Sequence, residues 1–163
     1  MIEIKTMSPD QWQLYKTMRC GALAEAPYAY SSTLDDALKR SDEDWQQLTR
    51  QYARDPNSVT YFAFEDEVPC GISACVIDGS EAEMFAVWVD PSYRRKGVGT
   101  QLVEYARVWS VSQGARKLKV GVFDDNPTGL MFYHSAGFQD IGQIKPELSS
   151  KDRTVHLLAM NLL

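Results

Sequence analysis

The chain is organised around the stretch Val87-Trp88-Val89-Asp90-Pro91-Ser92-Tyr93-Arg94-Arg95-Lys96-Gly97-Val98-Gly99-Thr100. Its first residues are apolar and have strand character, and the Asp-Pro pair ends a strand because proline cannot donate to a sheet ladder. After a basic turn with two glycines, apolar residues recur at helical spacing, at positions 98, 102, 106 and 109. The pattern predicts a strand, a turn and a helix, with residues 94–100 at the N-terminus of the helix.

This turn combines three features that favour an anionic ligand. The first amides of a helix have no partner within the helix, and the helix dipole is positive there. Gly97 and Gly99 allow a ligand to approach the backbone without a Cβ in the way. Arg94, Arg95 and Lys96 add positive charge. Together these features predict a pocket for a phosphate or a pyrophosphate group.

Two common phosphate-binding motifs do not match the turn. The nucleotide-hydrolase motif GxxxxGK[ST] fails because the lysine precedes the glycines and no glycine stands five positions before Gly97. The dinucleotide motif GxGxxG fails because its third glycine is Leu102 and no first βαβ unit lies upstream. The pattern that remains is Arg-x-x-Gly-x-Gly after a strand. A solvated basic turn that caps an ordinary helix is the alternative.

Composition limits the class of protein. The 163 residues, 44% hydrophobic and 24% charged, predict one globular domain over residues 1–163. The net charge of −5 disfavours nucleic acid as a partner, so the local basic turn indicates a small anionic ligand. The three cysteines show no CxxC and indicate neither a disulfide framework nor a zinc site. We expect no signal peptide and no membrane span, and therefore a cytoplasmic protein.

Periodicity and turn signals predict strands and helices along the rest of the chain. Ser8-Pro9 predicts a helix start, Ser41 to Asp44 is similar to a capping box, and Asp78-Gly79 predicts a hairpin. The expected helices cover about residues 8–26, 41–55, 97–113 and 126–137, and the expected strands cover 2–5, 59–64, 68–77, 81–89, 117–123, 138–141 and 155–163. This order predicts an α/β (α+β) fold with helices on both faces of a mixed sheet.

Three segments of the second half resemble the GCN5-related N-acetyltransferase (GNAT) family. They are Glu83 to Pro91, Arg94 to Gly99, and Asn126 to Phe138, and they stand in the family's order. The resemblance covers about residues 60–143, and the first half is only loosely similar. It implies a GNAT-like mixed, mostly antiparallel sheet with a splayed central strand pair. It also implies acetyl-CoA as co-substrate, no metal, and transfer of the acetyl group to an amine.

The resemblance also implies where acetyl-CoA binds. The main chain of Val87 and Val89 would pair with the pantetheine arm, and an amide there would face the thioester oxygen. The side chains at positions 85, 87 and 89 would be ordinary core. Asn126 matches a position that hydrogen-bonds the pantetheine region, although Asn before Pro is equally a strong helix cap. The pyrophosphate would bind the turn formed by Arg94, Arg95, Lys96, Gly97, Val98, Gly99 and Thr100.

Two residues are candidates for the chemistry by the same resemblance. Tyr133 would be the general acid that protonates the CoA thiolate, since a thiol pKa of about 8.5 and a phenol pKa of about 10 are close; a core tyrosine is the alternative. Glu83 would be the base that takes the proton of the amine, and strand alternation predicts that it shares a face with Phe85 and Val87. An exposed edge glutamate, Glu81 as the base, or a water chain are the alternatives.

The acceptor is the least determined part of the prediction. Tyr28, Tyr30, Asp35 and Asp36 lie in the segment expected to face it. Acidic groups there suit a cationic amine or a polyamine, and a solvated loop explains the same charges. We expect transfer to a primary amine of a small molecule by direct attack in a ternary complex. A protein or peptide acceptor and an acyl-CoA-binding regulator without activity are the alternatives, and a homodimer is left open.

Overall fold

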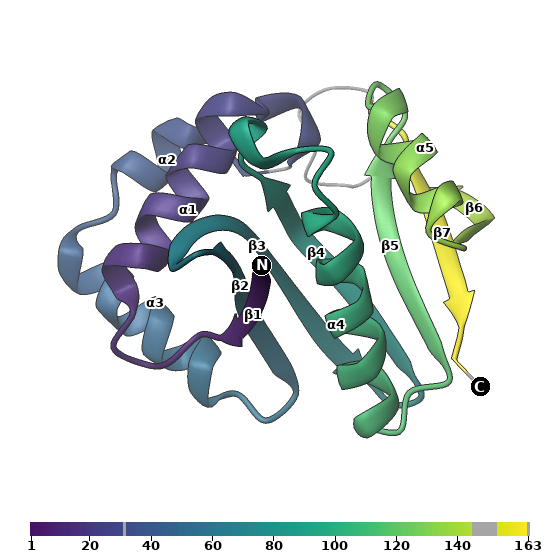
Figure 1. Ribbon diagram of the computed structural model, residues 1–163, viewed down its shortest axis with the longest axis horizontal. Helices are drawn as coiled ribbons and strands as arrows, with labels where there is room; N and C mark the ends of the chain where they lie inside the picture. Colours follow the sequence, from purple (N-terminus) through teal and green to yellow (C-terminus); the bar gives the residue numbers. More distant parts are fainter. Residues whose placement is uncertain (31, 145–152, 163) are drawn as a thin grey trace.

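A seven-stranded sheet forms the centre of the computed structural model, which describes residues 1–30, 32–144 and 153–162 (Figure 1). The strand order is β1-β2-β3-β4-β5-β7-β6, and every neighbouring pair is antiparallel except β4 and β5, which run parallel. The predicted mixed, mostly antiparallel sheet is therefore confirmed. The strands are β1 (Ile2–Thr6), β2 (Ser58–Glu65), β3 (Val68–Asp78), β4 (Glu81–Val89), β5 (Lys117–Phe123), β6 (Gln139–Ile144) and β7 (Val155–Asn161).

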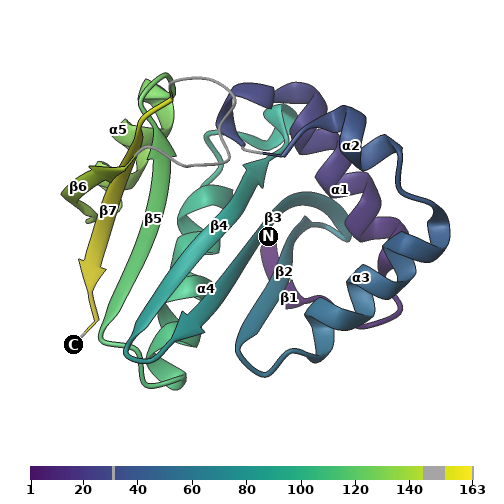
Figure 2. The ribbon, with the colours of Figure 1, turned by 180° about the vertical axis from the view of Figure 1, so that it is seen from behind.

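Helices cover both faces of the sheet, as predicted (Figures 1 and 2). One face packs against α1 (Trp12–Glu25), α2 (Leu34–Leu38) and α3 (Asp42–Arg54), and its buried cluster includes Phe62 and Trp88. The other face packs against α4 (Val98–Ser112) and α5 (Pro127–Ser135). The two helix layers place the two sides of β4 in different cores. None of the described helices has the length and apolar character needed to cross a bilayer.

Of two predicted helix starts, the structure confirms one and contradicts the other. The capping box of α3 is confirmed, because the Ser41 hydroxyl accepts from the Asp44 amide at 3.1 Å and the Asp44 carboxylate accepts from the Ser41 amide at 3.0 Å. The predicted start of the first helix at Ser8 is wrong, since α1 begins at Trp12. The Ser8 hydroxyl donates instead to the carboxylate of Asp10 at 2.7 Å, and residues 8–11 form a separate turn.

Strands β4 and β5 diverge halfway along their length. Their pairing covers only Glu81–Met84 with Lys117–Val120, and beyond it the two strands separate (Figure 2). The separation begins where the register between β3 and β4 shifts, and Ala86 there has a φ of 55°, which is rare for a residue with a Cβ. The bulge at Ala86 therefore marks the splay that the resemblance predicted.

The bulge also reverses the alternation of side chains along β4. Met84 lies in the core beneath α4 and α5, and so does the partly buried Val87, although the two are three residues apart. Glu83 and Phe85 alternate with Met84 and so face the opposite side of the sheet. The prediction that Glu83 shares a face with Val87 is therefore wrong. Phe85 is 43% exposed, so it is not a core side chain either.

Burial of Tyr15 makes the free energy of unfolding depend on pH. It lies in the core under α1 to α3, where its ring contacts the edges of the Trp45 and Tyr52 rings, and burial raises the pKa of Tyr15 to about 12. In an unfolded chain a tyrosine ionises at about pH 10. Above about pH 10 the unfolded state therefore binds fewer protons than the folded state, and the free energy of unfolding falls as the pH rises. We expect Tyr15→Phe to reduce this fall between about pH 8 and pH 11 by about 1 kcal/mol in urea unfolding. An identical fall in the parent protein and in Tyr15→Phe would contradict this prediction.

Candidate active site

A cleft with a volume of about 620 Å³, the first cleft, lies at the N-terminus of α4. It is bounded by β4, by the turn that precedes α4 and by α5. The turn has left-handed backbone at Arg95 and Gly97, with φ of 64° and 85°, and Gly97 caps the helix. The first-turn amides of Val98, Gly99 and Thr100 have no partner within the helix. The first cleft therefore presents main-chain donors at the positive end of the helix dipole.

The basic side chains of the turn are largely engaged within the protein. The Nε of Arg94 donates to the carbonyl oxygen of Val89 at 3.1 Å, and its guanidinium forms an ion pair with Glu25. The Nζ of Lys96 lies 3.4 Å from a carboxylate oxygen of Glu65, and the side chain is not part of the cleft wall. Arg95 lines the cleft and is exposed. Main-chain amides are therefore the principal binding groups that this turn offers.

The two glycines of the turn serve different purposes. A Cβ added at Gly97 would meet no atom within 4 Å, so this position leaves open space at the cleft. A Cβ added at Gly99 would lie 3.0 Å from Cζ of Phe132 on α5. Gly99 therefore allows α5 to pack closely against α4, and Gly97 is the glycine that leaves the backbone accessible to a ligand.

The edge of β4 beyond the bulge is open. The amide of Asp90 donates to Cys70 on β3, and because backbone groups alternate along a strand, those of Val87 and Val89 point away from β3. On that side β5 has already diverged. The carbonyl oxygen of Val87 accepts a hydrogen bond of 2.7 Å from the Tyr30 hydroxyl and, like any carbonyl, has a second lone pair. The carbonyl oxygen of Val89 likewise accepts from Nε of Arg94 and keeps a second lone pair. The amides of Val87 and Val89 and these second lone pairs are what the edge offers to an extended ligand with amide groups.

A second cleft, of about 340 Å³, lies between the diverging strands. Glu83 lines it, whereas Glu81 forms an ion pair with Lys119 at 2.8 Å. That contact with Lys119 lowers the pKa of Glu81, which makes it a weaker base. The residues common to the first and second clefts are Ala29, Tyr30, Val87, Asn126 and Tyr133. The structure therefore brings Glu83 and Tyr133 to one cleft and joins this cleft to the first.

Tyr133 stands where the two clefts meet. It is 8% exposed, its ring contacts Phe132 and Phe138 edge-on, and its hydroxyl has no hydrogen-bond partner among the described residues. Burial raises the pKa of Tyr133 well above that of an ordinary phenol. The hydroxyl therefore keeps its proton at neutral pH. The same burial makes it a weaker acid than a solvated tyrosine.

Asn126 caps a helix, as predicted, and its side chain also lies where the first and second clefts meet. Its side-chain oxygen accepts from the amide of Gly129 at 3.1 Å and caps α5. Its side chain also lines both clefts. Capping fixes the side chain at the junction of the clefts, so the two roles are compatible.

The segment expected to face the acceptor lines the clefts only in part. Tyr28 and Tyr30 line the clefts, whereas Asp35 and Asp36 lie exposed in the first turn of α2. Arg19 was not predicted: it lines the second cleft, with its guanidinium carbon 5.5 Å from the centre of the Tyr30 ring. The sequence pattern that could have indicated Arg19 is its position four residues after Tyr15, which places it on the buried side of α1.

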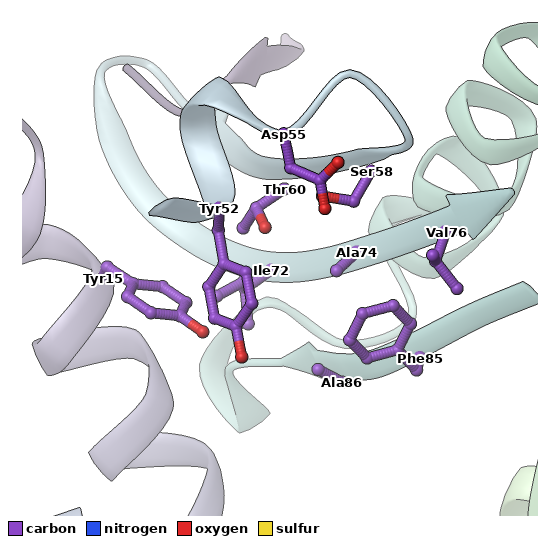
Figure 3. Close-up of a pocket in the computed structure, with 10 residues that line it drawn as sticks. All are labelled: Tyr15, Tyr52, Asp55, Ser58, Thr60, Ile72, Ala74, Val76, Phe85 and Ala86. Carbon is purple, nitrogen blue, oxygen red and sulfur yellow. The ribbon is translucent and has the colours of Figure 1, made fainter. Parts of the chain in front are cut away.

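A third cleft, of about 180 Å³, adjoins the second on the face of α1 and α3. Figure 3 shows the Phe85 ring and Ala86 of β4 on one side, and Tyr15 and Tyr52 from the helices on the other. Phe85 and Ala86 line both this cleft and the second. The bulge of β4 is therefore the boundary between the second and third clefts.

Comparison with known proteins identifies the family of this architecture. A family model described as the acetyltransferase (GNAT) family matches residues 25–138. Mycothiol acetyltransferase of Clavibacter sepedonicus is 24% identical over 139 residues, which make up 85% of this chain and 43% of that protein. The chain spans less than half of the length of the curated relatives that it matches.

Solved structures share the whole fold at low identity. Spermidine N-acetyltransferase from Vibrio cholerae, in complex with CoA and spermine, superposes with a TM-score of 0.81 and 13% identity, and 99% of this chain and 95% of that chain are covered. An acetyl transferase from Salmonella typhimurium that modifies the N-terminal serine of a ribosomal subunit protein gives 0.81 and 14% over the same shares. At such identities the likeness concerns the fold.

Gly97 and Gly114 form a matched pair for testing the turn. They lie at opposite ends of α4 with φ of 85° and 84°, and an added Cβ meets no atom within 4 Å at either. We expect both alanine variants to lose about 1–2 kcal/mol of unfolding free energy, because a Cβ disfavours the left-handed conformation. Only Gly97→Ala should weaken binding of CoA, by about tenfold in a calorimetric titration. Equal CoA affinities would contradict ligand binding at this turn.

Proposed function

The chain belongs to the acetyltransferase (GNAT) family, and we propose that it transfers the acetyl group of acetyl-CoA to a primary amine of a small molecule, by direct attack in a ternary complex. One observation carries the proposal: two clefts meet where β4 and β5 diverge. The first cleft has a helix N-terminus at one end, and the second contains the carboxylate of Glu83. A donor in the first cleft and an amine in the second would meet beside Val87 and Tyr133.

The residues of the first cleft fit CoA chemically. Open space at Gly97 and the first-turn amides of α4 suit a pyrophosphate. The open edge of β4 at Val87 and Val89 suits the amide groups of a pantetheine arm, which would pair with it as an added strand does. The solved spermidine N-acetyltransferase with this fold contains CoA. When bound, acetyl-CoA supplies an acetyl group activated as a thioester.

Three groups of the protein would then act on the reaction. The carboxylate of Glu83 would take the proton of the amine, directly or through water, because an amine of pKa near 10 is mostly protonated at neutral pH. An amide at the open edge of β4 would stabilise charge on the carbonyl oxygen. The hydroxyl of Tyr133, kept protonated by burial, would give its proton to the departing sulfur.

The second cleft favours a small acceptor over a protein chain. Its volume is about 340 Å³, and Tyr30 and Phe123 form part of its wall. Arg153 links two sides of this wall: its guanidinium donates to the carbonyl of Tyr28, forms an ion pair with Asp125 at 2.9 Å, and lies 3.5 Å from the centre of the Phe123 ring. A polypeptide acceptor would have to pass these contacts. An acyl-CoA-binding regulator would share the first cleft but would release no free thiol.

Glu83 and Glu81 form a matched pair for testing the base. They lie two residues apart on β4 and on the same face, but only Glu83 lines the second cleft. We expect Glu83→Gln to lower kcat by about 100-fold or more, because the variant cannot accept a proton. Glu81→Gln should leave kcat within about twofold. The measurement is the release of free thiol from acetyl-CoA with an active amine, and equal rates in both variants would remove Glu83 from the mechanism.

Tyr133→Phe tests the acid. The variant keeps the ring that packs against Phe132 and Phe138, so the fold and the affinity for CoA should be preserved. Loss of the proton donor should lower kcat by about 100-fold with little change in KM for the amine. Full activity in a variant that still binds CoA in a thermal melt would exclude the acid role.

A further inference from the structure

We infer that the acceptor is an amine that also carries a carboxylate, that Arg19 binds this carboxylate, and that a neutral apolar side chain of the acceptor occupies the third cleft. The inference deepens the proposed function and rests on it. An α-amino acid with an aromatic or large aliphatic side chain has this chemistry. It starts from Arg19, a partly buried arginine on α1 whose side chain lines the second cleft.

Arg19 lacks a partner for its charge. Its Nη1 is buried without a hydrogen-bond partner, and no carboxylate of the described residues lies within 4.0 Å of its guanidinium. Arg94, Arg107 and Arg153, by contrast, each form an ion pair. An arginine does not lose its charge at neutral pH, and a partly buried cation without a counter-charge is costly. A carboxylate entering the second cleft, which the side chain of Arg19 lines, would supply that counter-charge.

The protein holds this guanidinium in position without neutralising it. The Tyr30 ring lies 5.5 Å from the guanidinium carbon and supplies a cation–π contact, but no acceptor oxygen for Nη1. The charge of Arg19 acts on Tyr30 of the second cleft and on Tyr15 of the third, opposing the rise that burial imposes on the pKa of each. Arg19 therefore lines the second cleft, and its charge reaches Tyr15 of the third.

The charges of the second cleft suit a zwitterion. Glu83 offers a carboxylate to the amine, and Arg19 offers a guanidinium to a carboxylate. In the transfer, the acceptor enters as an ammonium and first loses one proton to Glu83, which later releases it to solvent. The nitrogen of the acceptor then forms a bond to the acetyl carbon as the bond from that carbon to sulfur breaks, and Tyr133 gives its proton to the sulfur. The second proton of the nitrogen passes through water to Tyr133 and restores its hydroxyl. An acceptor with several positive charges would be repelled by Arg19. The cleft thus favours an amino acid over a polyamine.

The third cleft suits a neutral apolar side chain. Ile72, Val76, Phe85 and the Tyr52 ring form much of its wall (Figure 3). Its volume of about 180 Å³ is of the order that holds a single benzene ring in a protein interior. The carboxylate of Asp55 also lines it and would repel an acidic side chain. The side chain would enter past the β4 bulge, where Phe85 and Ala86 are common to the second and third clefts.

The test compares amines that differ only in the carboxylate. Free-thiol release is measured with acetyl-CoA and L-phenylalanine, 2-phenylethylamine or spermidine. The parent protein should favour phenylalanine over the other two by about 30-fold or more in kcat/KM. Arg19→Met, which keeps the apolar stem, should remove most of this preference by raising KM for phenylalanine, with 2-phenylethylamine unchanged, and Arg19→Lys should restore part of it. A preference of the parent for either amine without a carboxylate overturns the inference.

Arg40→Met is the matched control. Arg40 also makes a cation–π contact, at 5.2 Å over the Trp45 ring, but lines none of the three clefts, so this variant should keep the preference of the parent. An equal loss for all amines in Arg19→Met would mean a structural role only and would overturn the inference. If the parent turns over none of the three amines, transfer to these acceptors is excluded, but their binding can still be measured. The inference is then decided by thermal melts with CoA present. Stabilisation of the parent, but not of Arg19→Met, by L-phenylalanine supports the inference. If L-phenylalanine does not stabilise the parent, the inference is overturned.

Discussion

The structure depends on the loss of pairing between two parallel strands at its centre. Parallel neighbours normally pair along their whole length, but β4 and β5 stop after four residue pairs, at Met84 and Val120. The cause lies in β4, where the bulge and the left-handed backbone of Ala86 shift the register against β3. Such backbone is costly and persists only where the surrounding structure holds it. Here the two cores on either side of β4 hold it.

The same bulge relates the three clefts to which we assign different parts of one reaction. It ends pairing with β5 and so opens the strand edge that the pantetheine arm would use. It turns Val87 toward the core of α4 and α5, while Glu83 and Phe85 face the helices of the first half. A single extra residue thus places Val87 and Glu83 on opposite sides of one strand.

The net charge that the basic turn presents depends on carboxylates far away in the sequence. Arg94 is paired with Glu25 and Lys96 with Glu65, so most of the positive charge is balanced inside the protein. The anion site that we propose here would then depend on oriented amides, which need no counter-ion and keep their direction because the helix fixes them. Arg19 represents the opposite arrangement, a cation of the second cleft whose Nη1 has no hydrogen-bond partner among the described residues.

Local patterns in the sequence were sufficient to predict most strands and helices, the capping box of α3 and the glycine-rich turn, because these depend on neighbours within a few residues. Family resemblance placed Tyr133 and Asn126 at one site. Only the tertiary structure decided which face Glu83 occupies, since a β-bulge leaves no periodic signal, and which basic side chains remain free, since Arg94 finds its partner 69 residues away. The role of Gly99 likewise depends on Phe132 of another helix. Contacts between distant segments set charge balance and packing, and a linear pattern does not contain them.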